Sequence, residues 1–258
     1  MSRPILAFAA SLLLAAVTVS AGPVTPVPTI EPEPPSGSPW QFEILPYLWA
    51  VNLDGTVGVL GTTSQIDVGF DDILDNLDFA GSLLAGVRYD RFGLLVDAEY
   101  VKVSPSFETP GPFFSRTDLT MEQILVDLKA SYRIWESDRG WLDLAAGARY
   151  MHLDLDISFQ PGIAPGFGLS GNEGWWDTIG GLRARFNLTR VVYLTALADV
   201  GGGGSDITWQ ALGGIGFQLT RNIDLRLVYR YLKVDYASGG FTYDVATQGL
   251  GLGLGLQF

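Results

Sequence analysis

Apolar and polar residues alternate with a period of two along most of the chain from residue 40 onward, and this pattern restricts the fold more than any other feature. In the segment FGLLVDAEYVKV (92–103), Phe92, Leu94 and Val96 would share one face of a strand, opposite Asp97 and Glu99. The segments 124–134 and 223–231 alternate in the same way. Such strands fit a β-sandwich, which buries the apolar face between two sheets, or a membrane barrel, which turns it toward lipid.

The polar face of these strands favours the barrel, because it carries charges of both signs that can pair inside a closed lumen. Aromatic residues on the apolar face near strand ends favour it too, since they suit an interfacial girdle. The expected lumen-lining charges are Arg88, Asp97, Glu99, Asp127, Lys129, Arg133, Asp143, Arg149, Arg183, Arg185, Asp224, Arg226 and Arg230. The expected girdle residues are Tyr89, Phe92, Tyr100, Tyr132, Tyr150, Phe186, Phe217, Tyr231 and Phe258.

The alternation of short and long connections between the strands also favours a barrel. Short turns are expected near residues 90–91, 136–140, 188–190 and 220–222, and long connections at 104–117, 159–174 and 237–245. The strands then fall at 41–52, 79–90, 92–103, 118–135, 141–157, 174–187, 191–200, 206–219, 223–236 and 246–258. The fold class is therefore all-β, a transmembrane antiparallel up-and-down β-barrel of about ten strands, with eight or twelve as alternatives. Residues 54–77 would form the first outer loop, a hairpin projecting above the membrane.

The up-strands contain a weak repeat, EYVKVS (99–104), RYMHLD (149–154) and RYLKVD (230–235). It places three of the girdle tyrosines at the outer interface. Lys102, His152 and Lys233 follow two residues later on the same face. Two interpretations are open for these three side chains: contact with lipid phosphates, or simple extension from the membrane edge toward water.

The N-terminal region predicts export. Arg3 precedes an apolar run and small residues end it at Ala21, so residues 1–21 are expected to be a cleaved signal peptide rather than a membrane anchor, for which the run is short. Residues 22–39 are rich in proline and are expected to be an extended periplasmic tail. The barrel would then occupy residues 40–258.

The chain ends in GLGLGLQF, in which Leu250, Leu252, Leu254, Leu256 and Phe258 would face lipid while the intervening glycines face the lumen and leave space there. This ending resembles the C-terminal signature of bacterial outer-membrane β-barrel proteins, a terminal aromatic preceded by alternating hydrophobic residues. The resemblance implies recognition by the barrel-assembly machinery. From Trp40 onward the chain resembles the small porin-like and uncharacterised barrel families of Gram-negative bacteria, which implies the cell outer membrane as its location and outer-membrane lipid as its surroundings.

Candidate catalytic and metal sites are few. The chain has no cysteine and one histidine, which excludes multi-histidine and cysteine metal centres, and its net charge of −12 argues against nucleic-acid binding. His152 with Asp154 and Asp156 resembles the omptin family of outer-membrane proteases, which would imply a hydrolase at the outer rim; a lipid-modifying hydrolase is a further alternative. Four carboxylates, at Asp71, Asp72, Asp75 and Asp78, suit either a cation site or a short amphipathic turn.

The glycine run GGGGSD (201–206) lacks the lysine and helix of a phosphate loop and is expected to be an outer turn. We therefore expect no catalytic residue, metal or cofactor. The function expected is that of a monomeric outer-membrane barrel with a structural, surface-interaction or narrow-pore role. If the lumen charges pair, they block the lumen; if they remain unpaired at a constriction, the barrel would be a porin-like channel for small polar solutes.

Overall fold

The computed structural model describes residues 39–59, 62–108 and 113–258. The expected signal peptide and most of the expected tail lie outside these residues. Within the described ranges, no helix is long and apolar enough to cross a membrane.

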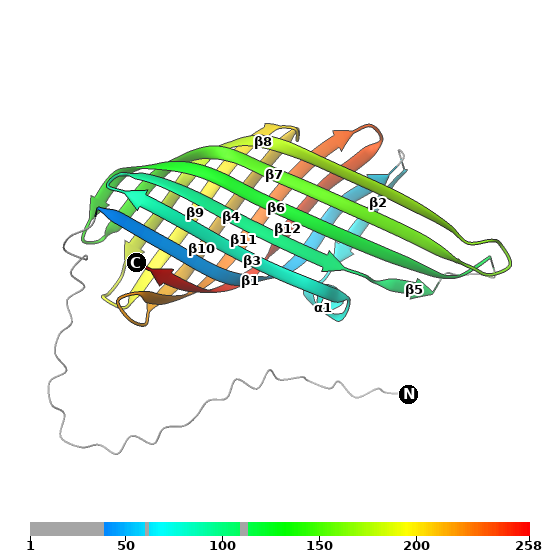
Figure 1. Cartoon of the computed structure of the whole chain (residues 1–258), viewed down its shortest axis with the longest axis horizontal. Coiled ribbons are helices and arrows are strands. Elements are labelled where there is room, and N and C mark those ends of the chain that lie inside the picture. The colour runs from blue at the N-terminus through cyan, green and yellow to red at the C-terminus, as the bar shows by residue number, and fades with distance from the viewer. Residues whose placement is uncertain (1–38, 60–61, 109–112) are drawn as a thin grey trace, which may run out of the picture. The chain divides into compact units, whose positions relative to one another are not determined.

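Nearly all of the described chain is antiparallel β-structure (Figure 1). The alternating segments form long strands because a strand places successive side chains on opposite faces. The elements in the described ranges are β1 (Trp40–Val59), β2 (Thr62–Val68), α1 (Phe70–Asp75), β3 (Leu77–Tyr89), β4 (Phe92–Val103), β5 (Ser106–Glu108), β6 (Phe114–Ser137), β7 (Gly140–Pro161), β8 (Phe167–Asn187), β9 (Val192–Gly203), β10 (Ile207–Gln218), β11 (Ile223–Ser238) and β12 (Phe241–Gln257).

The strands close into a ring. Each pairs with the next in the order β1-β3-β4-β6-β7-β8-β9-β10-β11-β12, and β12 pairs back to β1 from Glu43↔Gln257 to Gly58↔Thr242. Within the described residues, β2 pairs with β1 alone and β5 with β6 alone, so both lie outside the ring. The all-β, up-and-down barrel of about ten strands is confirmed.

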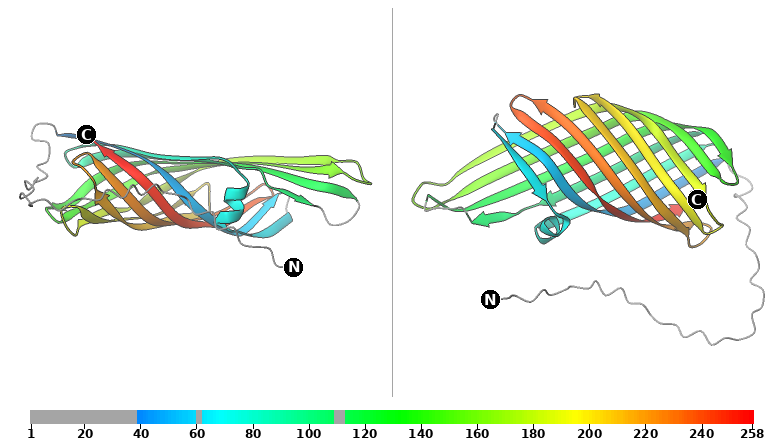
Figure 2. Two further views of the ribbon diagram at one scale, coloured as in Figure 1. Left: turned by 90° about the horizontal axis from the view of Figure 1, so that it is seen from below. Right: turned by 180° about the vertical axis from the view of Figure 1, so that it is seen from behind.

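The two ends of the barrel differ. One end, called the near end, holds Trp40, Phe258 and the short turns at 90–91, 138–139, 188–191 and 219–222. The opposite end, called the far end, holds the β1–β2 hairpin and α1 (Figures 1 and 2). Residues 54–58, which were expected to begin an outer loop, instead continue β1 and pair with β12 in the wall of the ring, and β2 lies along β1.

The long connections expected at the far end are mostly strand instead. β6, β7 and β8 continue together beyond the other strands (Figures 1 and 2), and a two-residue turn at Gly239 and Gly240, both with positive φ, joins β11 to β12. Polar residues in these segments suggested loops, but the backbone hydrogen bonds of the ladder continue through them. We call this outer part of the three strands the extension: residues 114–122 of β6, 153–161 of β7 and 167–173 of β8.

The outside of the ring is apolar. On β12, Leu250, Leu252 and Leu254 are 55%, 52% and 42% exposed, whereas the glycines between them are buried. Leu48 and Phe92 are about two-thirds exposed elsewhere on the wall. An apolar outer wall of this kind is typical of barrels surrounded by lipid.

Candidate functional site

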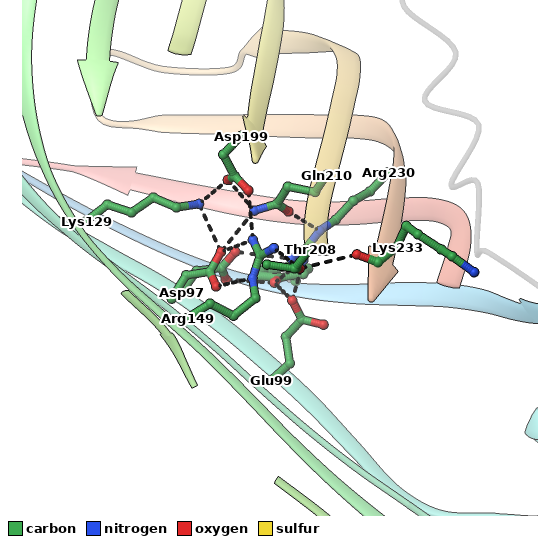
Figure 3. Close-up of polar contacts among 11 residues, drawn as sticks. Asp97, Glu99, Lys129, Arg149, Asp199, Thr208, Gln210, Arg230 and Lys233 are labelled. Atoms are coloured by element: carbon green, nitrogen blue, oxygen red, sulfur yellow. Dashed lines mark hydrogen bonds and ion pairs between the residues drawn. The ribbon is translucent and has the colours of Figure 1, made fainter. Parts of the chain in front are cut away.

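The barrel interior is crossed by an ion-pair network centred on Arg149 of β7, whose side chain is fully buried. Its Nε and Nη2 donate to the two carboxylate oxygens of Asp127 on β6, at 2.7 and 2.8 Å. Nη2 also donates to Asp199 on β9 at 3.0 Å, and Nη1 to Thr208 on β10 at 2.8 Å. One guanidinium thus joins four strands, using the fork of donors that suits arginine to buried carboxylates (Figure 3).

Lys129 and Gln210 extend this network. The Lys129 ammonium donates to Asp127 at 2.9 Å and to Asp199 at 2.7 Å, and the Gln210 amide donates to the same two carboxylates. Gln210 in turn accepts from Arg230 Nε at 2.9 Å (Figure 3). The polar contacts therefore run from one wall of the barrel to the other.

Arg230 carries the network on to β1 and β4. Its Nη1 donates to Glu99 and, at 3.3 Å, to the Tyr47 hydroxyl, and its guanidinium stands 4.6 Å from the ring centre of Trp49. The Tyr47 hydroxyl donates to Asp97 at 2.7 Å and also to Glu99. Arg230 is 3% exposed, so these contacts lie well inside the barrel.

A second set of ion pairs lies nearer the near end. Arg226 on β11 donates to Asp224 at 2.8 Å and to Glu43 on β1, and Arg183 on β8 donates to Glu43 at 3.0 Å. Asp143, which is completely buried, accepts from both Arg88 and Arg133. Arg185 places its guanidinium 3.5 Å from the ring centre of Tyr193.

Charges of the two signs are equal in number across this interior. Among the described residues it holds eight cations, namely Arg88, Lys129, Arg133, Arg149, Arg183, Arg185, Arg226 and Arg230. It holds eight carboxylates, namely Glu43, Asp97, Glu99, Asp127, Asp143, Asp177, Asp199 and Asp224. Among the described residues, all of these charges except Arg185 and Asp177 take part in ion pairs.

The structure places all thirteen expected lumen charges inside the ring and brings them together. Sequence reasoning missed Glu43, Asp177 and Asp199, together with the polar partners Tyr47 and Gln210. Asp177 has the same strand parity as Arg183 and Arg185 of β8, so a consistent count along that strand would have found it, whereas none of the recognised charges lies on β1 or β9, the strands of Glu43 and Asp199. Of these, Asp177 is 1% exposed, and its Oδ1 accepts the Ser205 backbone N–H at 2.7 Å.

Toward the far end, the interior becomes apolar, which the sequence interpretation did not anticipate. The rings of Trp175 on β8 and Tyr236 on β11 stack 3.8 Å apart and almost parallel. They belong to a buried layer that also contains Leu125, Met151, Leu153, Leu232, Val234, Tyr243 and Val245. This apolar layer covers the ion-pair network on its far-end side.

A cavity of about 80 Å³ remains within the ring, between the Arg230 and Arg226 ion pairs. Gly251 and Gly253 of β12 line it together with Tyr47 and Leu45. A Cβ added at Gly253 would lie only 2.9 Å from the Tyr47 Cβ. A larger residue at this position would therefore crowd Tyr47, and glycine keeps this side of the cavity open.

The expected girdle residues lie on the outer surface, where several form aromatic pairs. Phe92 packs against Tyr132 with ring centres 5.0 Å apart, and Tyr231 stacks on Trp209 at 4.9 Å. Tyr150 packs against Trp176 at 4.8 Å. The two tryptophans were not among the expected girdle residues.

The basic residues of the sequence repeat are engaged with neighbouring groups. Lys102 forms an ion pair with Glu122 at 2.6 Å and Lys233 with Asp244 at 2.5 Å. His152 stacks on Tyr150 with ring centres 6.4 Å apart. The two lysines therefore already have carboxylate partners, which weakens the interpretation that they contact lipid phosphates.

The candidate catalytic and metal residues do not converge. His152, Asp154 and Asp156 follow one another at every second position of β7, on its outward face, away from the interior. Asp71, Asp72 and Asp75 belong to the short helix α1, and Asp78 accepts from Ser104 Oγ at 2.5 Å. Across the described parts of the chain, no group of three or more acidic, histidine or cysteine side chains is placed to hold a metal ion.

The far end is strongly acidic. In the described residues it carries three basic side chains, Lys102, Arg116 and Lys233, against fifteen carboxylates. The carboxylates are those of Asp54, Asp67, Asp71, Asp72, Asp75, Asp78, Glu108, Asp118, Glu122, Asp154, Asp156, Glu173, Asp206, Asp235 and Asp244. The negative charge of the protein is therefore concentrated at this end of the barrel.

No protein-family model matches the sequence, and no curated protein matches it. Among solved structures, the chain is similar to the translocator domain of the autotransporter NalP from Neisseria meningitidis, with 16% identity, a TM-score of 0.50, and 87% of this chain and 90% of that one covered. It is also similar to the outer membrane protease OmpT from Escherichia coli, with 10% identity, a TM-score of 0.52, and coverage of 84% and 97%. At these identities the likeness concerns the fold, and the fold is that of the outer-membrane β-barrels.

Proposed function

We propose that this protein is an outer-membrane barrel with a closed interior that works at the cell surface by binding, rather than by passing solutes or by catalysis. The observation that carries the proposal is the filled interior: among the described residues, ion pairs join seven charges of each sign, and the layer around Trp175 and Tyr236 covers them. Two successive barriers of different chemistry oppose passage, since an ion meets the apolar layer and an apolar solute meets the charges.

The orientation follows from the outer wall and the two ends. Exposed leucines and aromatic pairs on the outside suit lipid, and short turns with both strand termini at one end are typical of the periplasmic side. The far end, with its acidic residues and the extension, would then face outward. Phe258 and the exposed leucines of β12 would serve as the recognition signal for the assembly machinery.

Two features of the far end that the interior lacks favour binding at the surface. The far end has more carboxylates than basic side chains to pair with them, and it has exposed apolar side chains. Phe113, Ile163 and Phe167 at the tip of the extension are 64%, 76% and 49% exposed. Apolar side chains grouped beyond the membrane are typical of sites that contact another molecule.

Single-channel conductance of the refolded chain in a planar bilayer tests the closed interior. We expect no discrete steps from protein that migrates as a folded, heat-modifiable species on a gel. Discrete steps whose ion preference changes in the variants Arg226→Gln and Arg230→Gln would establish a channel and overturn the proposal.

Orientation is tested with single cysteines, which the chain itself lacks. A membrane-impermeant maleimide applied to intact cells should label Ser170→Cys in the extension and leave Arg221→Cys, in a near-end turn, unlabelled. The reverse labelling would place the far end inside and would contradict a role at the cell surface.

A further inference from the structure

Strand β8 has an open edge along its outer part. β7 pairs with β8 from Phe159↔Phe167 at the far end to Gly140↔Phe186 at the near end. β9 pairs with β8 only from Asp177 to Asn187. The last contact on the β9 side is the Gly204 N–H, which donates to the Trp176 carbonyl at 2.8 Å. In the described chain, residues 167–175 have no strand on that side.

The backbone groups that face the open side can be identified. Because the Trp176 carbonyl points toward β9, the even-numbered residues of β8 direct their N–H and C=O groups to that side. The register between β7 and β8 continues without a shift. Gly168, Ser170, Asn172 and Gly174 therefore present unpaired donors and acceptors in the pattern that another strand would satisfy.

Natural sheets usually protect such an edge with lysine, proline or a bulge. The sequence of this edge, FGLSGNEGW (167–175), contains neither lysine nor proline. β6, at the opposite side of the extension, is instead covered by β4 and β5. On that side the outermost strand is β5, which has only three residues and so offers a short edge, whereas β8 offers the long unpaired edge of the extension.

The two faces beside the open edge have different chemistry. On one face, Phe167 and Leu169 are 49% and 40% exposed and lie across from Phe159 and Ile157 of β7. On the other face, β8 carries only small or short side chains, Gly168, Ser170 and Asn172.

Across from these small residues stand acids of β7. Asp156 is the cross-strand neighbour of Ser170, and Asp154 that of Asn172. Among the described residues neither aspartate takes part in an ion pair. An added strand would lie about 10 Å from β7, two strand spacings away. Lysine or arginine side chains on it can approach the two carboxylates by extending over the small residues between.

We propose that the open edge of β8 binds an extended segment of another protein in which apolar and basic residues alternate. The segment would pair with the even-numbered backbone groups, place its apolar residues beside Phe167 and Leu169, and direct its basic residues toward Asp154 and Asp156. The excess of fifteen carboxylates over three basic side chains at the far end supplies the matching long-range attraction. This inference rests on the proposed function and assigns its site and partner class.

A second copy of this chain fits the edge poorly. Two barrels upright in one membrane are related by an axis along the membrane normal, and this rotation reverses the faces of the sheet at a shared edge. The Phe167 face of one copy would then lie beside the Asp156 face of the other.

The test uses a synthetic ten-residue peptide of alternating valine and lysine with blocked ends, titrated by fluorescence anisotropy against the full chain in uncharged detergent. We expect binding that weakens with salt and that the alternating valine and glutamate peptide does not show. Ser170→Pro removes an outward N–H at a position where an edge strand tolerates proline, and should weaken binding at least tenfold. Ser170→Ala keeps the backbone donor and should bind within twofold of the parent chain.

The paired variant Asp154→Asn with Asp156→Asn should reduce both affinity and its salt dependence. Equal binding by Ser170→Pro and Ser170→Ala, with both folded by gel mobility, would overturn the site, as would absence of peptide binding. Self-association of the parent chain that Ser170→Pro abolishes would assign the edge to a second copy and also overturn it. A non-conducting, correctly oriented barrel that ignores the peptide refutes the edge alone, whereas a conducting barrel refutes the proposed function.

Discussion

The interior of the barrel and its far end both contain many aspartates and glutamates, but these carboxylates have opposite surroundings in the two regions. Inside, Asp127 and Asp199 share Arg149 and Lys129, and eight carboxylates face eight cations. At the far end, within the described ranges, fifteen carboxylates meet three basic side chains, and Asp156 is exposed without an ion pair. Where water is excluded, a charge requires a partner; where water is present, it does not. Burial, rather than residue type, decides whether an aspartate stabilises the fold or remains free to attract a partner.

The sharpest test of this difference is a pair of methionine substitutions. Arg149→Met leaves Asp127 and Asp199 short of a buried cation and should lower the free energy of unfolding by about 3 to 5 kcal/mol. Lys233→Met removes a far-end ion pair in which Asp244 is 44% exposed and should cost at most about 1 kcal/mol. Denaturant titration of the barrel in lipid vesicles measures both values. Equal losses would mean that position along the barrel does not govern the contribution of a charge.

The two neighbouring tryptophans of β8 extend the comparison to apolar residues. Trp175 is 5% exposed and stacks on Tyr236, so Trp175→Ala should lower the free energy of unfolding by about 3 kcal/mol. Trp176 lies outside at 54% exposure with Tyr150 as its ring partner, and Trp176→Ala should cost about 1 kcal/mol.

Single-channel conductance of Trp175→Ala is a second measurement on the same variant. Because the ion pairs lie beneath the apolar layer, folded Trp175→Ala should remain non-conducting. Current through this variant would assign the closure to the aromatic layer alone.

The smallest effect concerns a carboxylate of the extension. The Ser106 hydroxyl donates to Asp118 at 2.8 Å and holds the pKa of that carboxyl below its usual range. A lowered pKa in the folded state stabilises the protein above the unfolded pKa, and this stabilisation is lost as the pH falls through the folded value. Ser106→Ala should therefore raise the pKa of Asp118, as measured by NMR titration of the carboxyl carbon. An unchanged titration would show that β5 does not hold Ser106 against β6.

Much of the barrel could be predicted from the sequence, because a strand has a period of two and a charge such as Arg226 identifies the inward face of a whole strand. The pairing partners could not, since Arg149 on β7 meets Asp199 on β9 and Thr208 on β10 across the curved interior, between strands that do not pair with β7. The apolar layer was missed because Leu232 and Val234 have the parity of the lumen residues but the chemistry expected of the outer face. The strands of the extension were missed because these segments were assigned to long connections, although their backbone groups still pair.

The ion pairs of Glu43 depend on strands that are far from it in the sequence, which affects the order of folding. It lies near the start of the first strand, yet its ion-pair partners, Arg183 and Arg226, lie on the eighth and eleventh strands of the chain. The contact with Arg226 cannot form in an intermediate that lacks β11 and β12, so water takes the place of that partner at the Glu43 carboxylate until then. Expulsion of that water belongs to the last stage of assembly, when β12 reaches β1, and links completion of the seam to formation of these interior ion pairs.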